Sequence, residues 1–271
     1  MKIPKSIPIL TLVFFAAFAD AAIAAEDITF VASVDQTEQR YVQLLPPDFH
    51  TNEPTDVLIA LHGHGSDRWQ FIRQNRDECR AVRDVARKHG MVLISPDYRA
   101  KTSWMGPKAE ADLVQIIGEL KRNFSGRRVF LCGASMGGAS CLTFAALHPE
   151  LLDGVASMNG TANHLDYENF QAAIAQSFGG SKTEIPDEYK KRSAEFRPER
   201  FTMPVAFTVG GRDRSVPPDS VLRLATKLKT TNKNTLLIHR ENGGHSTTYA
   251  DAVRILEFVT QKKPSDHRKG N

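Results

Sequence analysis

The chain has 271 residues, of which 41% are hydrophobic and 24% are charged, with 14 prolines, 18 glycines and 3 cysteines. This is a globular composition, long enough for one large domain around a single core and too short for two comfortable ones. It excludes a disordered, collagen-like or disulfide-framework protein. The formal net charge of +4, from 35 Lys and Arg against 31 Asp and Glu, could indicate a polyanionic partner, so its position in the chain matters.

The excess positive charge lies near the two ends of the chain. Without residues 1–24 the count is 33 basic against 30 acidic residues, which is +3, and the polar tail 262–271, with four basic residues and one acidic, carries another +3. The intervening body is formally neutral. An Arg-rich helix predicted around Arg73–Arg87 is interleaved with acidic residues and is typical of a solvated face. We therefore expect no nucleic-acid partner.

Residues 1–24 have the pattern of a secretory signal peptide. Lys2 and Lys5 precede an apolar run over residues 7–19, and the small residues at 22–24 offer a cleavage site near Ala24 and Ala25. The run is shorter than the ~20 residues of a membrane-spanning helix, which makes an uncleaved anchor the weaker alternative. We expect a secreted or periplasmic protein without a membrane span, whose main domain covers residues 25–261.

The three cysteines, Cys79, Cys132 and Cys141, lie among apolar or helical residues. Their odd number and these surroundings favour buried, unreactive thiols, although one pair could still form a disulfide.

Short apolar runs of β type alternate with amphipathic helices after the leader. Two runs, 28–34 and 41–45, predict a hairpin at a sheet edge, because Pro46-Pro47 stops the second. The later runs are near-continuously apolar, as in strands buried on both faces, and they cover residues 57–61, 91–94, 129–132, 155–158, 205–209 and 235–238.

Apolar stripes at helical spacing lie between these strands, within residues 113–124, 221–228 and 249–256. Strand followed by helix, repeated along the chain, predicts an α/β fold with a mostly parallel sheet covered by helices on both faces. Residues 163–203 are too long for a simple crossover and mix aromatic with charged side chains, so we interpret them as an inserted lid of short helices.

A nucleophile motif stands near the middle of the chain. The run 129–132 leads directly into Gly133-Ala134-Ser135-Met136-Gly137, and a helix-like run follows. A G-x-S-x-G sequence between a strand and a helix makes a sharp turn that projects the serine hydroxyl above the sheet edge. The same pattern can occur in ordinary loops, but its placement here favours a nucleophilic Ser135.

A serine nucleophile needs a base, and the base needs a carboxylate to hold its tautomer. In this architecture the acid follows a later strand and the histidine comes last. Asp213 follows the strand 205–209, and His245 follows the strand 235–238 behind two glycines. Alternatively, Asp213 could only cap its turn and His245 could be a surface residue; Asp219 is expected to be a helix N-cap.

An oxyanion hole requires two backbone N–H groups. We assign one to Met136, the residue after the nucleophile, and the second to His64 in the loop after the strand 57–61, with Gly63 as the next choice. His62 and His64 could instead ligate a metal, but no Cys, His or paired carboxylate nearby in sequence completes a ligand set, so we predict no metal site.

Three further residues are candidates for substrate contacts. Trp104 and Trp69 lie at the same end of the predicted sheet and could stack on a sugar or aryl ring, or pack against the lid instead. Asn159 ends the strand 155–158 and is expected to shape the pocket.

These motifs together resemble the α/β-hydrolase superfamily, from about residue 28 to residue 259. Within it the chain resembles exported bacterial esterases related to dienelactone hydrolases, feruloyl and acetyl-xylan esterases, and the catalytic domains of prolyl-oligopeptidase-type enzymes. The resemblance implies the α/β-hydrolase fold with an eight-stranded sheet, acyl-enzyme chemistry and no cofactor.

The expected function is therefore hydrolysis of carboxylic esters, with short acyl or hydroxycinnamoyl groups, in a small-molecule or polysaccharide-linked substrate. A serine peptidase of the prolyl-oligopeptidase type is the alternative. A catalytically silent binding module is a third, disfavoured because all three triad members are present. The sequence does not specify an oligomeric state.

Overall fold

The computed structural model describes residues 25–47, 49–50, 53–124 and 128–261. The predicted signal peptide 1–24 and the polar tail 262–271 lie outside the described residues. Within the described part, none of the helices has the length and apolarity needed to cross a membrane.

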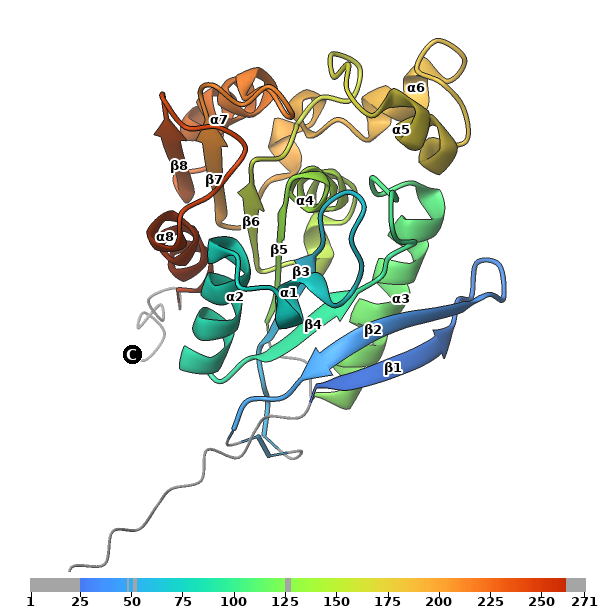
Figure 1. The fold of residues 1–271 in the computed structure, drawn as a ribbon, viewed down its shortest axis with the longest axis vertical. Helices are drawn as coiled ribbons and strands as arrows, with labels where there is room; N and C mark the ends of the chain where they lie inside the picture. The colour runs from blue at the N-terminus through green and yellow to red at the C-terminus, as the bar shows by residue number, and fades with distance from the viewer. Residues whose placement is uncertain (1–24, 48, 51–52, 125–127, 262–271) are drawn as a thin grey trace, which may run out of the picture.

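Eight strands of the described chain form one sheet in the order β1-β2-β4-β3-β5-β6-β7-β8 (Figure 1). The antiparallel hairpin β1–β2 stands at one edge, β2 pairs antiparallel with β4, and all later neighbours are parallel. This confirms the predicted α/β-hydrolase fold. The strands are β1 Glu26–Val31, β2 Glu38–Leu44, β3 Val57–Leu61, β4 Val92–Pro96, β5 Val129–Ala134, β6 Gly154–Met158, β7 Val205–Gly210 and β8 Thr235–Arg240.

The central strands are buried on both faces, which explains their unbroken apolar runs. In β3, Ile59 and Leu61 point into one core, whereas Leu58 and Ala60 point into the other. Helices α2 and α8 cover the second core and α3, α4 and α7 the first. The helices of the described chain are α1 Gln70–Arg73, α2 Asp77–Lys88, α3 Pro107–Asn123, α4 Met136–Leu147, α5 Gln171–Phe178, α6 Pro186–Lys191, α7 Asp219–Thr231 and α8 Tyr249–Thr260.

The Arg-rich segment differs from the single helix expected around Arg73–Arg87. Helix α1 ends at Arg73 because Gln74 takes an extended conformation, and α2 begins only at Asp77. The acidic side chains of Asp77 and Glu78 then lie in the first turn of α2, where the helix dipole favours negative charge.

The predicted lid, residues 163–203, contains α5, α6 and two short 3₁₀ helices, and Figure 1 shows α5 and α6 beyond α4. The buried guanidinium of Arg192 fastens this segment to the body. It donates to Glu188 at 2.7 Å and to the carbonyl oxygen of Met105 at 2.8 Å, and it pairs with Glu110 of α3 at 2.8 Å.

Candidate active site

The turn between β5 and α4 places Ser135 in a rare backbone conformation. Its φ is +58° and its ψ is −121°, which L side chains avoid unless the surroundings impose them. The turn packs tightly on the end of β3: a Cβ at Gly137 would lie 1.9 Å from the carbonyl oxygen of Leu61, and one at Gly133 would lie 2.6 Å from Gly137. Only glycine fits two positions before and two positions after the serine, as the sequence pattern predicts.

The structure brings Ser135, His245 and Asp213 together in a hydrogen-bonded chain. His245 Nδ1 lies 2.6 Å from Asp213 Oδ2, and its Nε2 lies 2.8 Å from Ser135 Oγ. Because a carboxylate only accepts, the proton of the neutral ring sits on Nδ1, and Nε2 accepts from the serine hydroxyl. Ser135, Asp213 and His245 lie in the segments that follow β5, β7 and β8, and the carboxyl ends of these parallel strands lie at one edge of the sheet.

The buried carboxylate of Asp213 makes the contacts of both roles that the sequence allows, the triad acid and the turn cap. Its Oδ1 accepts the backbone N–H groups of Ser215 and Val216, each at 2.9 Å, while its Oδ2 holds His245. The Asp213 side chain is 1% exposed and that of His245 is 29% exposed, so the acid is shielded and the base is partly accessible to solvent. Asp219 is not the N-cap that the sequence suggests, because α7 already begins at Asp219 and Pro218 holds the cap position.

The loop 62–65 lies directly against the nucleophile turn. A Cβ at Gly63 would lie 3.7 Å from the Cβ of Ser135. Among the described residues, the backbone N–H groups of Met136 and His64 have no hydrogen-bond acceptor. They are thus free to bind an oxyanion.

The assignment of Gly63 as an oxyanion donor is wrong. Its N–H donates to the side-chain oxygen of Gln70 at 2.9 Å, so it has no bond left to offer a substrate. Sequence reasoning missed Gln70 altogether. Its only signal was a polar residue at the start of a helix, seven positions after the glycine.

Both histidines of this loop are held by protein groups. The two ring nitrogens of His62 lie 2.8 and 3.1 Å from the carbonyl oxygens of Gly63 and Asp97, so both are directed at protein groups inside the fold. Trp104 Nε1 lies 3.3 Å from His64 Nδ1; an indole only donates, which puts the His64 proton on Nε2. Burial lowers the pKa of both rings and favours their neutral forms.

Trp104 is fully buried and cannot stack on a substrate as one of our two expectations had it. Its indole packs against the lid instead, with ring centroids 5.6 Å from Tyr167 and from Phe170. Trp69 is partly exposed, but the Arg73 guanidinium lies 3.5 Å from its ring centroid and occupies one face of the indole.

Asn159 also differs from the expected substrate contact, because its side chain is engaged inside the protein. Its Oδ1 accepts from the hydroxyls of Thr208 and Thr247, at 3.3 and 3.1 Å, and its Nδ2 donates to the carbonyl oxygen of Gly244 at 3.4 Å. Asn159 therefore supports the loop that carries His245, and it shapes the site from behind.

Two lid residues, Tyr167 and Phe170, also lie near the site, and the sequence analysis did not predict either of them as a site residue. Tyr167 Oη donates to the carbonyl oxygen of Ser215, in the loop that follows β7 and carries Asp213, at 2.8 Å. Phe170 is 40% exposed, and its ring centroid lies 4.4 Å from that of His64. The beginning of the lid thus contacts both the loop that carries Asp213 and the loop 62–65.

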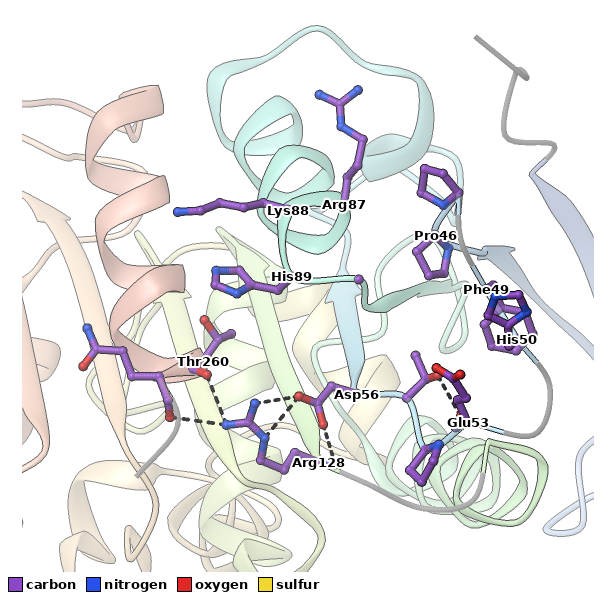
Figure 2. Close-up of a pocket in the computed structure, with 15 residues that line it drawn as sticks. Pro46, Phe49, His50, Glu53, Asp56, Arg87, Lys88, His89, Arg128 and Thr260 are labelled. Carbon is purple, nitrogen blue, oxygen red and sulfur yellow. Dashed lines mark hydrogen bonds and ion pairs between the residues drawn. The ribbon is translucent and has the colours of Figure 1, made fainter. Parts of the chain in front are cut away.

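A groove of about 760 Å³ lies at the opposite end of the sheet, before β3 and β5 (Figure 2). Its basic side chains have acidic partners: Arg128 pairs with Asp56 at 2.6 Å, Arg87 with Asp84 at 3.1 Å, and Lys88 and His89 both contact Glu257. It shares no residue with the candidate active site.

The three cysteine thiols are buried and free. Burial raises the pKa of Cys79 to about 12 and also raises those of Cys132 and Cys141, which suppresses the reactive thiolate.

Solved structures share this fold at low sequence identity. A Bacteroides ovatus protein named as a dipeptidyl aminopeptidase IV superposes with a TM-score of 0.68 at 17% identity, over 88% of this chain and 35% of its own. The Pyrococcus furiosus esterase Pf2001 superposes with a TM-score of 0.65 at 19% identity, over 94% and 98%. An S-formylglutathione hydrolase from Staphylococcus aureus has a TM-score of 0.65 at 16% identity, over 88% and 99%.

The chain spans about a third of the length of the first of these proteins. No curated protein matches the chain. The family model of the prolyl oligopeptidase family matches residues 86–262, which include Ser135, Asp213 and His245. Since that match covers more than half of the sequence, the chain belongs to the prolyl oligopeptidase family, within the α/β-hydrolase superfamily.

Proposed function

We propose that this protein is a serine hydrolase that cleaves carboxylic esters through an acyl-enzyme intermediate. The observation that carries the proposal is the unbroken chain from Ser135 through His245 to Asp213, with contacts of 2.8 and 2.6 Å. A base within hydrogen-bond reach of a hydroxyl, and itself oriented by a buried carboxylate, is the arrangement that activates serine.

In the proposed reaction, His245 Nε2 takes the proton of Ser135 as its oxygen attacks the ester carbonyl. Asp213 stabilises the imidazolium without becoming protonated, and the N–H groups of Met136 and His64 bind the developing oxyanion. The imidazolium then gives its proton to the leaving alcohol. Water, activated by the same histidine, attacks the acyl-enzyme and releases the acid.

Ester substrates are the preferred class for two reasons. Solved structures covered nearly end to end by this chain include proteins named as an esterase and an S-formylglutathione hydrolase. In addition, the partly exposed ring of Phe170 beside His64 offers an apolar wall for a short acyl or hydroxycinnamoyl group. Peptide hydrolysis is the second candidate, favoured by the family of the chain and by neighbours named as peptidases.

A substrate panel separates the two candidates. Purified protein is assayed with p-nitrophenyl acetate, p-nitrophenyl butyrate, methyl ferulate and a dipeptidyl p-nitroanilide, beside the Ser135→Ala variant. The proposal predicts higher kcat/KM for the esters and loss of all turnover in the variant. Anilide cleavage without an ester preference would establish the peptidase instead, and equal turnover by the variant would exclude Ser135 chemistry.

A further inference from the structure

The loop after β3 has its peptide groups pinned one by one. Tyr98 Oη donates to the carbonyl oxygen of His62 at 2.6 Å, and Gln70 Oε1 accepts the N–H of Gly63 at 2.9 Å, so the peptide between His62 and Gly63 is held at both ends. The carbonyl oxygen of Gly63 accepts from Ser66 N at 3.2 Å, and His62 Nδ1 lies 2.8 Å from it.

These bonds determine where the next N–H points. The peptide between Gly63 and His64 is trans, so its N–H is directed opposite to its carbonyl. Since that carbonyl is bonded into the loop, the N–H of His64 faces away from the loop interior and stays free. The same loop lies against the nucleophile, with a Cβ at Gly63 only 3.7 Å from the Cβ of Ser135.

We propose that Gln70 is a positioning residue that holds the oxyanion hole in its active geometry, an inference that rests on the proposed hydrolase function. The Gln70 side chain is buried, with the residue 3% exposed, and comes from α1, outside the catalytic loops. Without its oxygen the buried N–H of Gly63 has no acceptor, and the loop must turn that peptide to satisfy it. The adjoining peptide, which supplies the N–H of His64, turns with it.

The test replaces Gln70 by two side chains of similar size. Gln70→Met removes the acceptor, whereas the carboxyl oxygen of Gln70→Glu can still accept the N–H. Gln115→Met is the matched control. Gln115 Oε1, in α3, likewise accepts a backbone N–H, that of Ser33 in the turn between β1 and β2, at 2.8 Å. Each variant is measured for kcat and KM on p-nitrophenyl butyrate, inhibition by phenylboronic acid, labelling by a fluorophosphonate, and Tm.

We expect Gln70→Met to lower kcat by about 10- to 100-fold with KM within about twofold, less than the loss from deleting a donor outright. Boronate affinity should fall by a similar factor, because the tetrahedral adduct needs the same hole, while the final extent of labelling at Ser135 stays complete. Gln70→Glu should recover part of the loss, and Gln115→Met should match the wild type.

The inference is overturned if Gln70→Met matches Gln115→Met in kcat and boronate affinity. It is also overturned if Gln70→Met and Gln70→Glu lose the same fraction of kcat and if this loss follows the fall in Tm, because a general loss of stability would then explain both. A wild-type protein that neither hydrolyses the ester nor reacts with the fluorophosphonate would instead show that the proposed function itself has failed.

Discussion

At the scale of single residues, the site depends on which atom of each ring carries a proton. Asp213 accepts from His245 Nδ1 and so leaves Nε2 to accept from Ser135, while Trp104 donates to His64 Nδ1 and leaves a proton on its Nε2. Buried partners therefore set both tautomers, and the lone pair of His245 Nε2 faces the Ser135 hydroxyl.

Replacing Asp213 by Asn tests this arrangement. The amide oxygen can still accept from the backbone N–H groups of Ser215 and Val216, so the loop should keep its fold. The amide nitrogen, however, would face His245 Nδ1 and favour the tautomer whose Nε2 is protonated. We expect kcat to fall by about 10⁴-fold, the loss known for this change in serine proteases, with little change in Tm.

The matched control for that substitution is Asp219→Asn, at the exposed start of α7. Steady-state ester hydrolysis of both variants measures the difference. An Asp213→Asn enzyme as active as its Asp219→Asn counterpart would show that the acid has been misassigned.

At the scale of elements, the nucleophile turn is rigid because α4 begins in direct contact with the end of β3. A methyl group at Gly137 would come within 1.9 Å of the carbonyl oxygen of Leu61, a backbone atom that cannot move aside alone. The glycine therefore sets how closely strand, turn and helix pack.

Two Gly→Ala substitutions should have opposite effects. Gly137→Ala should destabilise the fold by at least about 3 kcal/mol, because overpacking here displaces backbone. Gly118→Ala, in the middle of α3, meets only the flexible end of Arg122 at 3.6 Å and should stabilise by up to about 1 kcal/mol, the helix preference of Ala over Gly. Urea unfolding of both variants measures the pair, and similar midpoints for the two would contradict the packing described.

The lid is attached through a carboxylate whose charge depends on pH. Burial alone would raise the pKa of Glu110, but its bonds to His148 and Arg192 lower the pKa from 4.5 to about 2. A carboxyl with a depressed pKa stabilises the fold while ionised, and this contribution is lost as the pH falls from about 4.5 towards 2.

Glu110→Gln should therefore lower the free energy of unfolding by about 1 to 3 kcal/mol at pH 7, because the buried Arg192 loses a charged partner. The difference in the free energy of unfolding between variant and wild type should become smaller as the pH falls from about 4.5 towards 2. Glu150→Gln is the control: Glu150 is 62% exposed and its removal should cost less than about 1 kcal/mol. A gap that stays constant from pH 7 to pH 3 would show that the Glu110 charge does not stabilise the lid contact.

At the scale of the whole molecule, periodicity and order were enough to predict the sheet and the three residues that meet at its edge. Strands buried on both faces have continuous apolar runs, which made the strands recognisable. Parallel strands bring their carboxyl ends together, so the order of Ser135, Asp213 and His245 after their strands predicted that the three side chains meet. The bond from Gln70 to Gly63, the burial of Trp104 and the inward-facing amide of Asn159 could not be predicted in this way. They depend on side-chain contacts between loops, which leave no periodic signal.

The most direct test of the account is to find where a fluorophosphonate bonds to the folded protein. Intact mass before and after reaction, followed by peptide mapping, should show one adduct per chain, on Ser135, formed in parallel with loss of ester hydrolysis. The Ser135→Ala variant should take up no label and hydrolyse no ester. Labelling at another residue, or ester hydrolysis that survives in Ser135→Ala, would contradict the assignment of Ser135 as the nucleophile.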